Sequence, residues 1–224
     1  MRKINGEYGV IIVLFLGLGV WKNWQNFTWQ APTFFLFGAV LLSSLIALYL
    51  RRLVHLYWCY KWGDINLTLQ GSKNHYPTEW IEWIGLVVFS FFMFGWGRPL
   101  VSNKSLKNPD RKKRALLIGT GLLVNLVSAL VVLLLIPYTE SFSLTFSAYL
   151  KLFAQINLHY FLVSLLPFPP FDLGYLWQSL WKKKTKPQPI EIYGLTFVFM
   201  LIILNVLPQS LVWLSDKLLF WILT

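Results

Sequence analysis

The sequence is poor in acidic residues and in cysteine, and each shortage excludes a class of protein. Only nine of the 224 residues are aspartate or glutamate, and charged residues of both signs make up 13% of the chain. A soluble domain carries about 25% charged residues, so this composition excludes an ordinary soluble fold. The single cysteine, Cys59, excludes an internal disulfide and a cysteine-based metal site. Its expected role is that of a small buried hydrophobic residue.

Apolar and aromatic residues take the place of the missing charges. They bring the hydrophobic fraction to 56%, with 12 tryptophans and 18 phenylalanines. Such a composition predicts an integral membrane protein surrounded by the lipid bilayer. The 20 lysines and arginines give a net charge of +11, but they lie in short loops between apolar runs, where cations orient helices and meet anionic headgroups. Nucleic acid is therefore not an expected partner.

The apolar runs predict an all-α fold of five or six transmembrane helices. We expect them at residues 8–21, 33–50, 115–136, 144–166 and 192–207, with 209–223 as the sixth. The run 80–96 is short for a crossing and is expected to be re-entrant or interfacial. The basic clusters at 2–3, 51–52, 98–114 and 182–186 then share the cytoplasmic face. No repeat or linker divides the chain, which predicts a single domain over 1–224.

Two segments far apart in the sequence carry the most specific signals. One is Arg51-Arg52-Leu53-Val54-His55, and the other is the Pro-rich segment 164–174 with the sequence SLLPFPPFDLG. Between them lie Gly63-Asp64, Leu69-Gln70-Gly71, and Gly95-Trp96-Gly97-Arg98-Pro99 followed by Asn103, Leu106 and Asn108-Pro109. This succession resembles the compact site-2 proteases, intramembrane zinc peptidases with HExxH in one membrane helix and a motif like NxLPxPPLDG at the end of a later one. The resemblance implies a site-2-protease-like helical bundle with its core at about 32–180.

The metal motif departs from the family pattern at two positions. The resemblance places Arg51 at the first histidine, Arg52 at the general-base glutamate, and leaves His55 and Asp172 as residual ligand positions. A catalytic zinc needs three protein ligands, and hydrolysis also needs a carboxylate to accept the proton of water. Arginine has no acceptor atom and is permanently charged, so it supplies neither. We therefore expect no intact catalytic residue and no cofactor, with zinc only if unusual ligands complete the site.

Other polar residues within the apolar runs leave two interpretations open. His75 and His159 would be substitute ligands, but neither has the i, i+4 relation to His55, and a loop histidine and a helix-packing histidine are the simpler interpretation. Asn125 and Asn157 resemble family positions that face the site. Together with Pro169 and Asp172 they are candidates for a substrate or partner groove, although intramembrane asparagines equally serve helix packing.

An ion pair is predicted where the metal would be. The resemblance places Asp172 at membrane depth, where a carboxylate is costly unless it is paired, coordinated or protonated. Arg51 lies one helical turn from His55, on the face that would look at the metal, and a guanidinium fork matches a carboxylate. We predict that Arg51 contacts Asp172 directly or through one water, with Arg52 as the second choice. The alternative is that both arginines extend to the headgroups.

The predicted function follows from the missing glutamate. We expect a non-proteolytic relative, a pseudoprotease that binds another integral membrane protein to regulate, stabilise or assemble it. Two alternatives remain: an active intramembrane zinc metalloprotease with unusual ligands, and a structural subunit of a larger membrane complex.

Overall fold

The computed structural model describes residues 31–62, 85, 88, 95–97, 111–141, 143–169, 171–180 and 187–223. Six helices follow one another: α2 (Ala31–Lys61), α6 (Arg111–Glu140), α7 (Leu144–Ser164), α8 (Asp172–Leu180), α9 (Pro187–Ile203) and α10 (Val206–Leu223). No strand occurs in these ranges, so the all-α prediction is confirmed for this part of the chain. The expected first helix at 8–21 lies outside the described residues.

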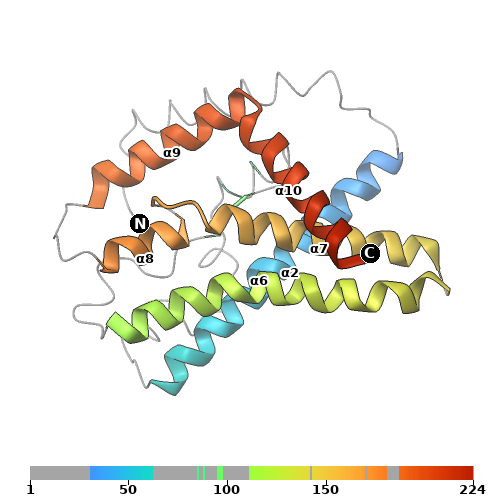
Figure 1. Cartoon of the computed structure of the whole chain (residues 1–224), viewed down its shortest axis with the longest axis horizontal. Helices are drawn as coiled ribbons and strands as arrows, with labels where there is room; N and C mark the ends of the chain where they lie inside the picture. Colours follow the sequence, from blue (N-terminus) through green and yellow to red (C-terminus); the bar gives the residue numbers. More distant parts are fainter. Residues whose placement is uncertain are drawn as a thin grey trace.

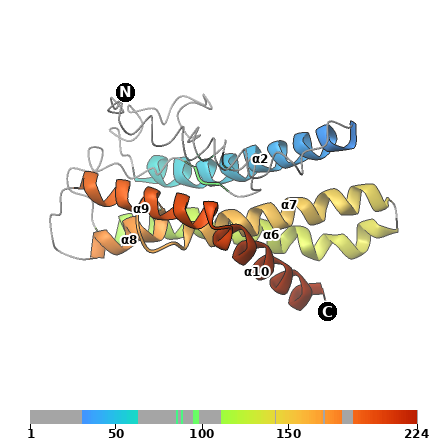
Figure 2. The same ribbon diagram turned by 90° about the horizontal axis from the view of Figure 1, so that it is seen from above.

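A long antiparallel hairpin of α6 and α7 forms the centre of the molecule. Both views show the two helices side by side along their length, joined by a short turn (Figures 1 and 2). Ser143 starts α7 as its N-cap, with its hydroxyl oxygen accepting from the backbone N–H of Phe146 at 3.3 Å. The interface contains small and branched apolar residues: Ala129, Leu133, Ile136, Ala154 and Leu158. The two alanines are fully buried, which lets the backbones approach closely.

Helix α2 crosses this hairpin and contacts both of its members (Figure 1). Against α7 it buries Val40, Ala47 and Leu48 on Ile156 and Tyr160. Against α6 it runs antiparallel, because Lys113 lies over the ring of Trp62 and His55 lies on Gly121. One turn further along, this register brings Arg51 level with Asn125. The polar turn of α2 from Arg51 to His55 thereby lies in the interior of the bundle.

Among the described helices, two are long and apolar enough to cross a membrane. They are Gly38–Trp58, with a mean hydropathy of 1.6, and Ala115–Thr139, with 2.4. The bent pair Tyr193–Ile203 and Val206–Trp221 makes a third if it counts as one crossing. Helix α7 lies at the predicted 144–166 span, but Lys151 and several other polar residues lower its hydropathy. The structure thus indicates a membrane protein with two or three crossings among the described helices, and the predicted five or six are not confirmed.

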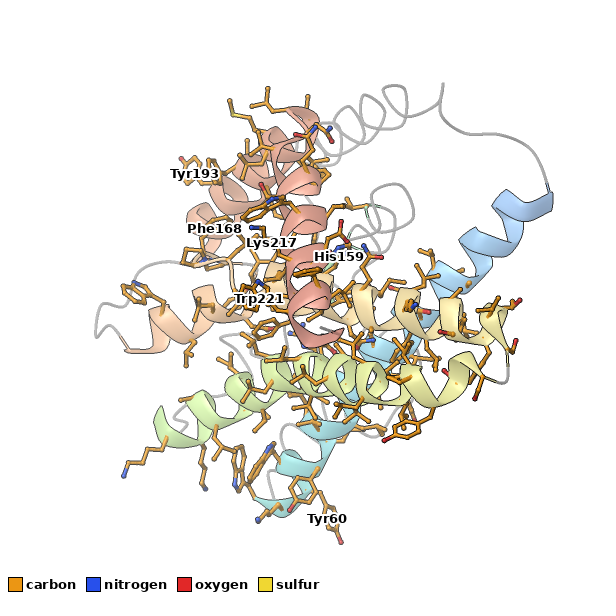
Figure 3. All side chains as sticks on the ribbon, turned by 45° about the vertical axis from the view of Figure 1, so that its right-hand side comes forward. Tyr60, His159, Phe168, Tyr193, Lys217 and Trp221 are labelled. Carbon is orange, nitrogen blue, oxygen red and sulfur yellow. The ribbon has the colours of Figure 1, made fainter. Side chains whose placement is uncertain are left out.

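The outer surface carries large apolar side chains. Tyr60 is 86% exposed, Tyr193 71% and Trp221 77%, and Tyr60 projects away from the ribbon in Figure 3. Many leucines and valines of α6 and α10 are also at least one-third exposed. Aromatic and aliphatic surface of this kind suits the interfaces and the hydrocarbon of a bilayer.

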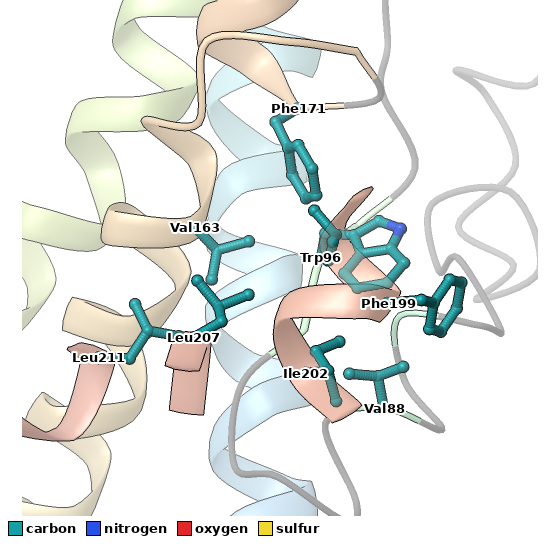
Figure 4. Close-up of a cluster of buried hydrophobic side chains, with 9 residues drawn as sticks. Val88, Trp96, Val163, Phe171, Phe199, Ile202, Leu207 and Leu211 are labelled. Atoms are coloured by element: carbon teal, nitrogen blue, oxygen red, sulfur yellow. The ribbon is translucent and has the colours of Figure 1, made fainter. Parts of the chain in front are cut away.

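A second apolar cluster joins the end of α7 to α9 and α10. It is shown in Figure 4 and comprises Val88, Trp96, Val163, Phe171, Val198, Phe199, Ile202, Leu207 and Leu211. Most of the 80–96 segment lies outside the described residues. A Cβ atom added at Gly85 would overlap the backbone carbonyl of Trp96, whereas a straight helix separates residues eleven positions apart by about 16 Å. Gly85 and Trp96 therefore do not belong to one straight helix, and a re-entrant or interfacial arrangement stays a prediction.

The Pro-rich turn after α7 is held between two glycines. A Cβ atom at Gly174, in the first turn of α8, would overlap the backbone carbonyl of Phe168. A Cβ atom at Gly194, in α9, would overlap the carbonyl oxygen of Pro169 from the other side. Because hydrogen allows a closer approach than a methyl group, the turn packs directly on both helices. This packing fixes the point at which Asp172 begins α8.

The corner between α9 and α10 differs from its predicted position. The sequence predicts a span at 192–207, whereas the structure ends α9 at Ile203 and bends the chain by 77° before α10. Asn205 adopts the left-handed conformation with a φ of 59°, and its N–H donates to the carbonyl of Ile202 at 2.9 Å. Asparagine is one of the few residues that accept this conformation as a helix cap. Because the sequence is apolar on both sides of Asn205, its hydrophobic pattern does not indicate the break between the two helices.

The left-handed cap gives a test of this corner. Asn205→Gly is expected to keep the thermal stability of the protein in detergent, because glycine adopts a positive φ without strain. Asn205→Val is expected to lose about 1–2 kcal/mol or more, because a left-handed conformation costs that much and a branched Cβ adds to it. Equal stability of the two variants would contradict the assigned conformation. The measurement is unfolding in mild detergent followed by circular dichroism.

Candidate functional site

The candidate site lies where the end of α2 meets α6, α7 and the start of α8. Arg51 and His55 lie one turn apart on α2 and are only 6% and 3% exposed, and Arg52 is 7% exposed. Charged side chains are seldom buried to this extent unless they are paired. The structure thus places these three residues in the interior, which disagrees with the alternative that the arginines extend to the headgroups.

Arg51 and Asp172 meet across 121 positions of sequence. The guanidinium Nη2 of Arg51 donates a hydrogen bond to Oδ1 of Asp172, forming an ion pair in which both side chains are buried. The hydroxyl of Ser164, at the end of α7, also hydrogen-bonds the Asp172 carboxylate. Charge-assisted hydrogen bonds of this kind are roughly twice as strong as neutral ones. Asp172 therefore accepts hydrogen bonds from two helices, whereas its second oxygen, Oδ2, has no hydrogen-bond partner among the described residues.

Opposing influences act on the protonation of Asp172. Burial is the largest and raises the pKa of its carboxyl above the ordinary value. The charge of Arg51 and the hydrogen bond from Ser164 both lower that pKa. Loss of Arg51 would remove the larger of these two opposing influences, so it would raise the pKa further and favour the neutral acid. The ionised carboxylate thus depends on the arginine beside it.

His55 packs tightly on the backbone of α6. A Cβ atom at Gly121 would overlap its imidazole Nε2, and the ring hydrogen-bonds the backbone of Leu117. Its Nδ1 is buried without a hydrogen-bond partner in the described part of the chain. The glycine thus makes room for the ring, and the hydrogen bond fixes it against α6. His55 therefore has one nitrogen occupied by the fold and one that the described fold does not use.

The two asparagines differ in their surroundings. Asn157 is fully buried and donates from Nδ2 to the carbonyl of Phe153 in its own helix at 2.9 Å, which leaves Oδ1 without a partner. Asn125 is 1% exposed, and within the described residues neither of its amide atoms has a partner. To the residues that the structure describes, neither asparagine forms the interhelical hydrogen bond that a purely packing role predicts. Pro169 is buried in the turn held by Gly194.

The structure describes one of the two histidines that were considered as substitute zinc ligands. His159 is buried, and its Nε2 lies 3.1 Å from the hydroxyl of Ser215 in α10. Figure 3 shows it beneath α10, as expected of a helix-packing histidine. His75 lies outside the described residues.

Two polar contacts were not predicted from the sequence. The hydroxyls of Ser44 and Tyr160 hydrogen-bond between α2 and α7, and Ser164 supports Asp172. In the sequence, the contact between Ser44 and Tyr160 was indicated only by a pair of serines, Ser43 and Ser44, inside the apolar run 33–50. The only signal for the second was Ser164 at the asparagine position of the Pro-rich motif.

The donor set at this site does not fit a catalytic zinc. It offers one imidazole nitrogen and one carboxylate, and Arg51 occupies an oxygen of that carboxylate. Across the described ranges no three His, Cys, Asp or Glu side chains come together as a group that holds a metal. A catalytic zinc takes three protein ligands and keeps one open position. Two guanidinium groups beside His55 would also repel a dication.

Comparisons with known proteins find a relative that is named as a putative zinc metalloprotease. The chain is similar to a protein of Bacillus subtilis (strain 168) named "Putative zinc metalloprotease YwhC", with 24% identity over 184 residues that cover 78% of this chain and 84% of the relative. No family model and no solved structure matches the chain. The similarity and the apolar helices together fit a membrane metalloprotease-like family. The narrower assignment to the site-2 proteases stays a prediction.

Proposed function

We propose that this chain is a pseudoprotease, a non-proteolytic membrane relative of zinc metalloproteases that binds another integral membrane protein. The observation that carries the proposal is the buried ion pair between Arg51 and Asp172. It supplies the carboxylate with the positive charge that a metal would otherwise provide. With arginine also at position 52, no carboxylate stands at the motif position that accepts the proton of water in hydrolysis.

A binding role is supported by polar atoms that the described fold leaves unused. The amide of Asn125, the Oδ1 of Asn157 and the Nδ1 of His55 are buried without hydrogen-bond partners. Buried polar groups in proteins are nearly always satisfied, so such atoms suit a polar group supplied from outside the described fold. An extended or unwound backbone segment of a partner offers both N–H donors and carbonyl acceptors, whereas an intact helix uses these groups internally. Regulation, stabilisation or assembly of that partner would then proceed without cleavage.

The second candidate is an active zinc metalloprotease with unusual ligands. The name of the Bacillus subtilis relative favours it, as do the unpartnered Oδ2 of Asp172 and Nδ1 of His55, which are atoms of ligand type. Within the described residues, His55 and Asp172 supply two ligands, whereas catalytic zinc sites use three. The positive charges of Arg51 and Arg52 also oppose the binding of a zinc dication. We therefore place it second.

Zinc content and cleavage distinguish the two candidates. The purified natural chain is expected to contain far less than one zinc per molecule by elemental analysis and to leave helical membrane substrates intact. The matched variant carries Arg51→His and Arg52→Glu, which rebuild HExxH on the same helix, and it is expected to bind about one zinc per chain. Stoichiometric zinc in the natural chain, together with cleavage that a chelator abolishes, would establish the second candidate instead.

Partner binding needs a test of its own. A photo-crosslinking amino acid at Asn125 is expected to capture a membrane protein in living cells, whereas the same group at exposed Val131 on the same helix is expected to capture it much less. Equal capture at the two positions would indicate a general lipid-facing contact instead of a partner groove.

A further inference from the structure

The end of α2 and the start of α6 form a patch that combines lysine with aromatic side chains. We call it the lysine–tryptophan patch, and it consists of Tyr57, Trp58, Lys61, Trp62, Lys112 and Lys113. The three lysines and Tyr57 are exposed, and the two tryptophans are half-buried. None of these residues belongs to the candidate site described above. The patch is therefore a separate surface with no role in the proposed pseudoprotease.

Within the patch, two ammonium groups are held against a stacked pair of indoles. The rings of Trp58 and Trp62 stack with 5.2 Å between centroids and 29° between planes. Lys61 Nζ lies 5.1 Å from the centroid of Trp58, and Lys113 Nζ lies 5.8 Å from the centroid of Trp62. Both distances are within the range of a cation–π interaction. One lysine comes from each helix, so the tertiary fold itself brings the two charges to one indole pair.

The location of the patch matches the level of lipid headgroups. The first apolar span ends at Trp58 and the second begins at Ala115, so the two spans reach the same membrane surface where α2 and α6 meet. Tryptophan and tyrosine are enriched at that level in membrane proteins. Tyr57 also lies edge-on to Trp58 at 5.3 Å, which extends the aromatic surface. The patch thus lies where lipid phosphates are.

Positive charge is concentrated at the start of α6, which favours the binding of an anion there. The helix begins with four consecutive cations, Arg111–Arg114, and its first turn contains no acidic residue. The N-terminal end of a helix carries a partial positive charge, so cations are unfavourable there and anions are favourable. Asp110 precedes the helix in the sequence and supplies one negative charge against these four positive charges. A bound phosphate would relieve the repulsion and would accept hydrogen bonds from the lysines.

We propose that the lysine–tryptophan patch binds the headgroup phosphate of an anionic phospholipid of the surrounding bilayer. Lys61 and Lys113 supply the charge, and the indoles of Trp58 and Trp62 pack on the glycerol and upper acyl region. The aromatic component and the position at the ends of two spans favour a lipid over a free ion. An acidic segment of a soluble protein would use the charge but would leave the indoles at the level of the bilayer.

Native mass spectrometry of the delipidated full chain in detergent tests this proposal. Added phosphatidylglycerol is expected to bind in preference to phosphatidylcholine with the same acyl chains, and added salt is expected to weaken that preference. The pair Lys61→Gln and Lys113→Gln is expected to reduce phosphatidylglycerol affinity about tenfold. The control pair is Lys151→Gln and Lys217→Gln, which removes two exposed lysines elsewhere, including Lys217, whose Nζ lies 4.9 Å from the ring centroid of Trp213. It is expected to leave the affinity unchanged.

Each other outcome overturns the proposal. Equal losses in the two pairs would mean that only the total charge matters. An unchanged affinity in the Lys61 and Lys113 pair would place the lipid elsewhere. Full competition by glycerophosphate, which lacks acyl chains, or by a short polyglutamate peptide would identify a site for a soluble anion or an acidic segment. Because all four substitutions are on exposed side chains, thermal unfolding of both variants is expected to match that of the natural chain, which keeps the comparison valid.

Discussion

Arg51→Met is expected to lower the free energy of unfolding by about 3–5 kcal/mol, because removal of one partner of a buried ion pair leaves the other charge uncompensated. Of its side-chain hydrogen bonds within the described residues, Asp172 would then keep the one from Ser164, and burial would drive it toward the neutral acid. The loss belongs among the largest for a single substitution in this chain. Titration with sodium dodecyl sulfate from mixed micelles, followed by circular dichroism, measures it.

A double-substitution cycle separates the ion pair from simple loss of packing. Asp172→Asn removes the charge but retains the size and hydrogen-bonding capacity of the side chain. Arg51→Met combined with Asp172→Asn is expected to recover much of the loss, with an interaction energy of about 1–3 kcal/mol. Lys217→Met, on an exposed face of α10, is the control and is expected to change stability by less than about 1 kcal/mol. Strictly additive losses would mean that the two charges do not depend on each other.

Gly174→Ala is expected to lower stability by about 2–3 kcal/mol, the upper part of the range for overpacking a tightly packed position. The added methyl group would overlap the backbone of Phe168 and Pro169, and a backbone cannot rotate away as a side chain can. Relief requires the Pro-rich turn to move. That movement would displace Asp172, so the variant is also expected to weaken the coupling measured in the cycle above.

Gly119→Ala is the matched control for this substitution. It also lies within a helix, but a Cβ atom there meets nothing within 4 Å. Alanine is the better helix former by up to about 1 kcal/mol, so this variant is expected to be as stable as the natural chain or slightly more stable. Equal losses at the two positions would mean that the turn does not pack on α8 as described.

The sequence predicted the parts of the site that a helical period and a charge requirement determine. Arg51 and His55 share a face because they lie four residues apart, and a buried Asp172 needs a cation. The contacts of Asn125, Asn157 and Ser164 were not predictable, since an asparagine or serine in an apolar helix can bond to its own backbone, to a neighbour or to a ligand. Asn157 turned out to bond to its own helix.

The fold likewise has features that could be predicted from the sequence and features that could not. Helical class and the approximate position of α2, α6 and α7 follow from long apolar runs. The number of crossings did not follow, because α7 contains polar residues, among them the buried Asn157 and His159, that lower its hydropathy. The break before α10 also depends on the backbone of Asn205. Apolar periodicity carries no signal for a single left-handed residue.

The central claim is that an ion pair stands where a zinc ion would be, and one measurement tests it most directly. This is an experimental structure of the full chain purified with excess zinc, with anomalous scattering recorded at the zinc absorption edge. We expect the Arg51 guanidinium within about 3 Å of the Asp172 carboxylate, or joined to it by one water, and no anomalous peak between His55 and Asp172. A separation beyond about 6 Å without a bridging water, or a zinc peak coordinated by His55 and Asp172, would contradict it.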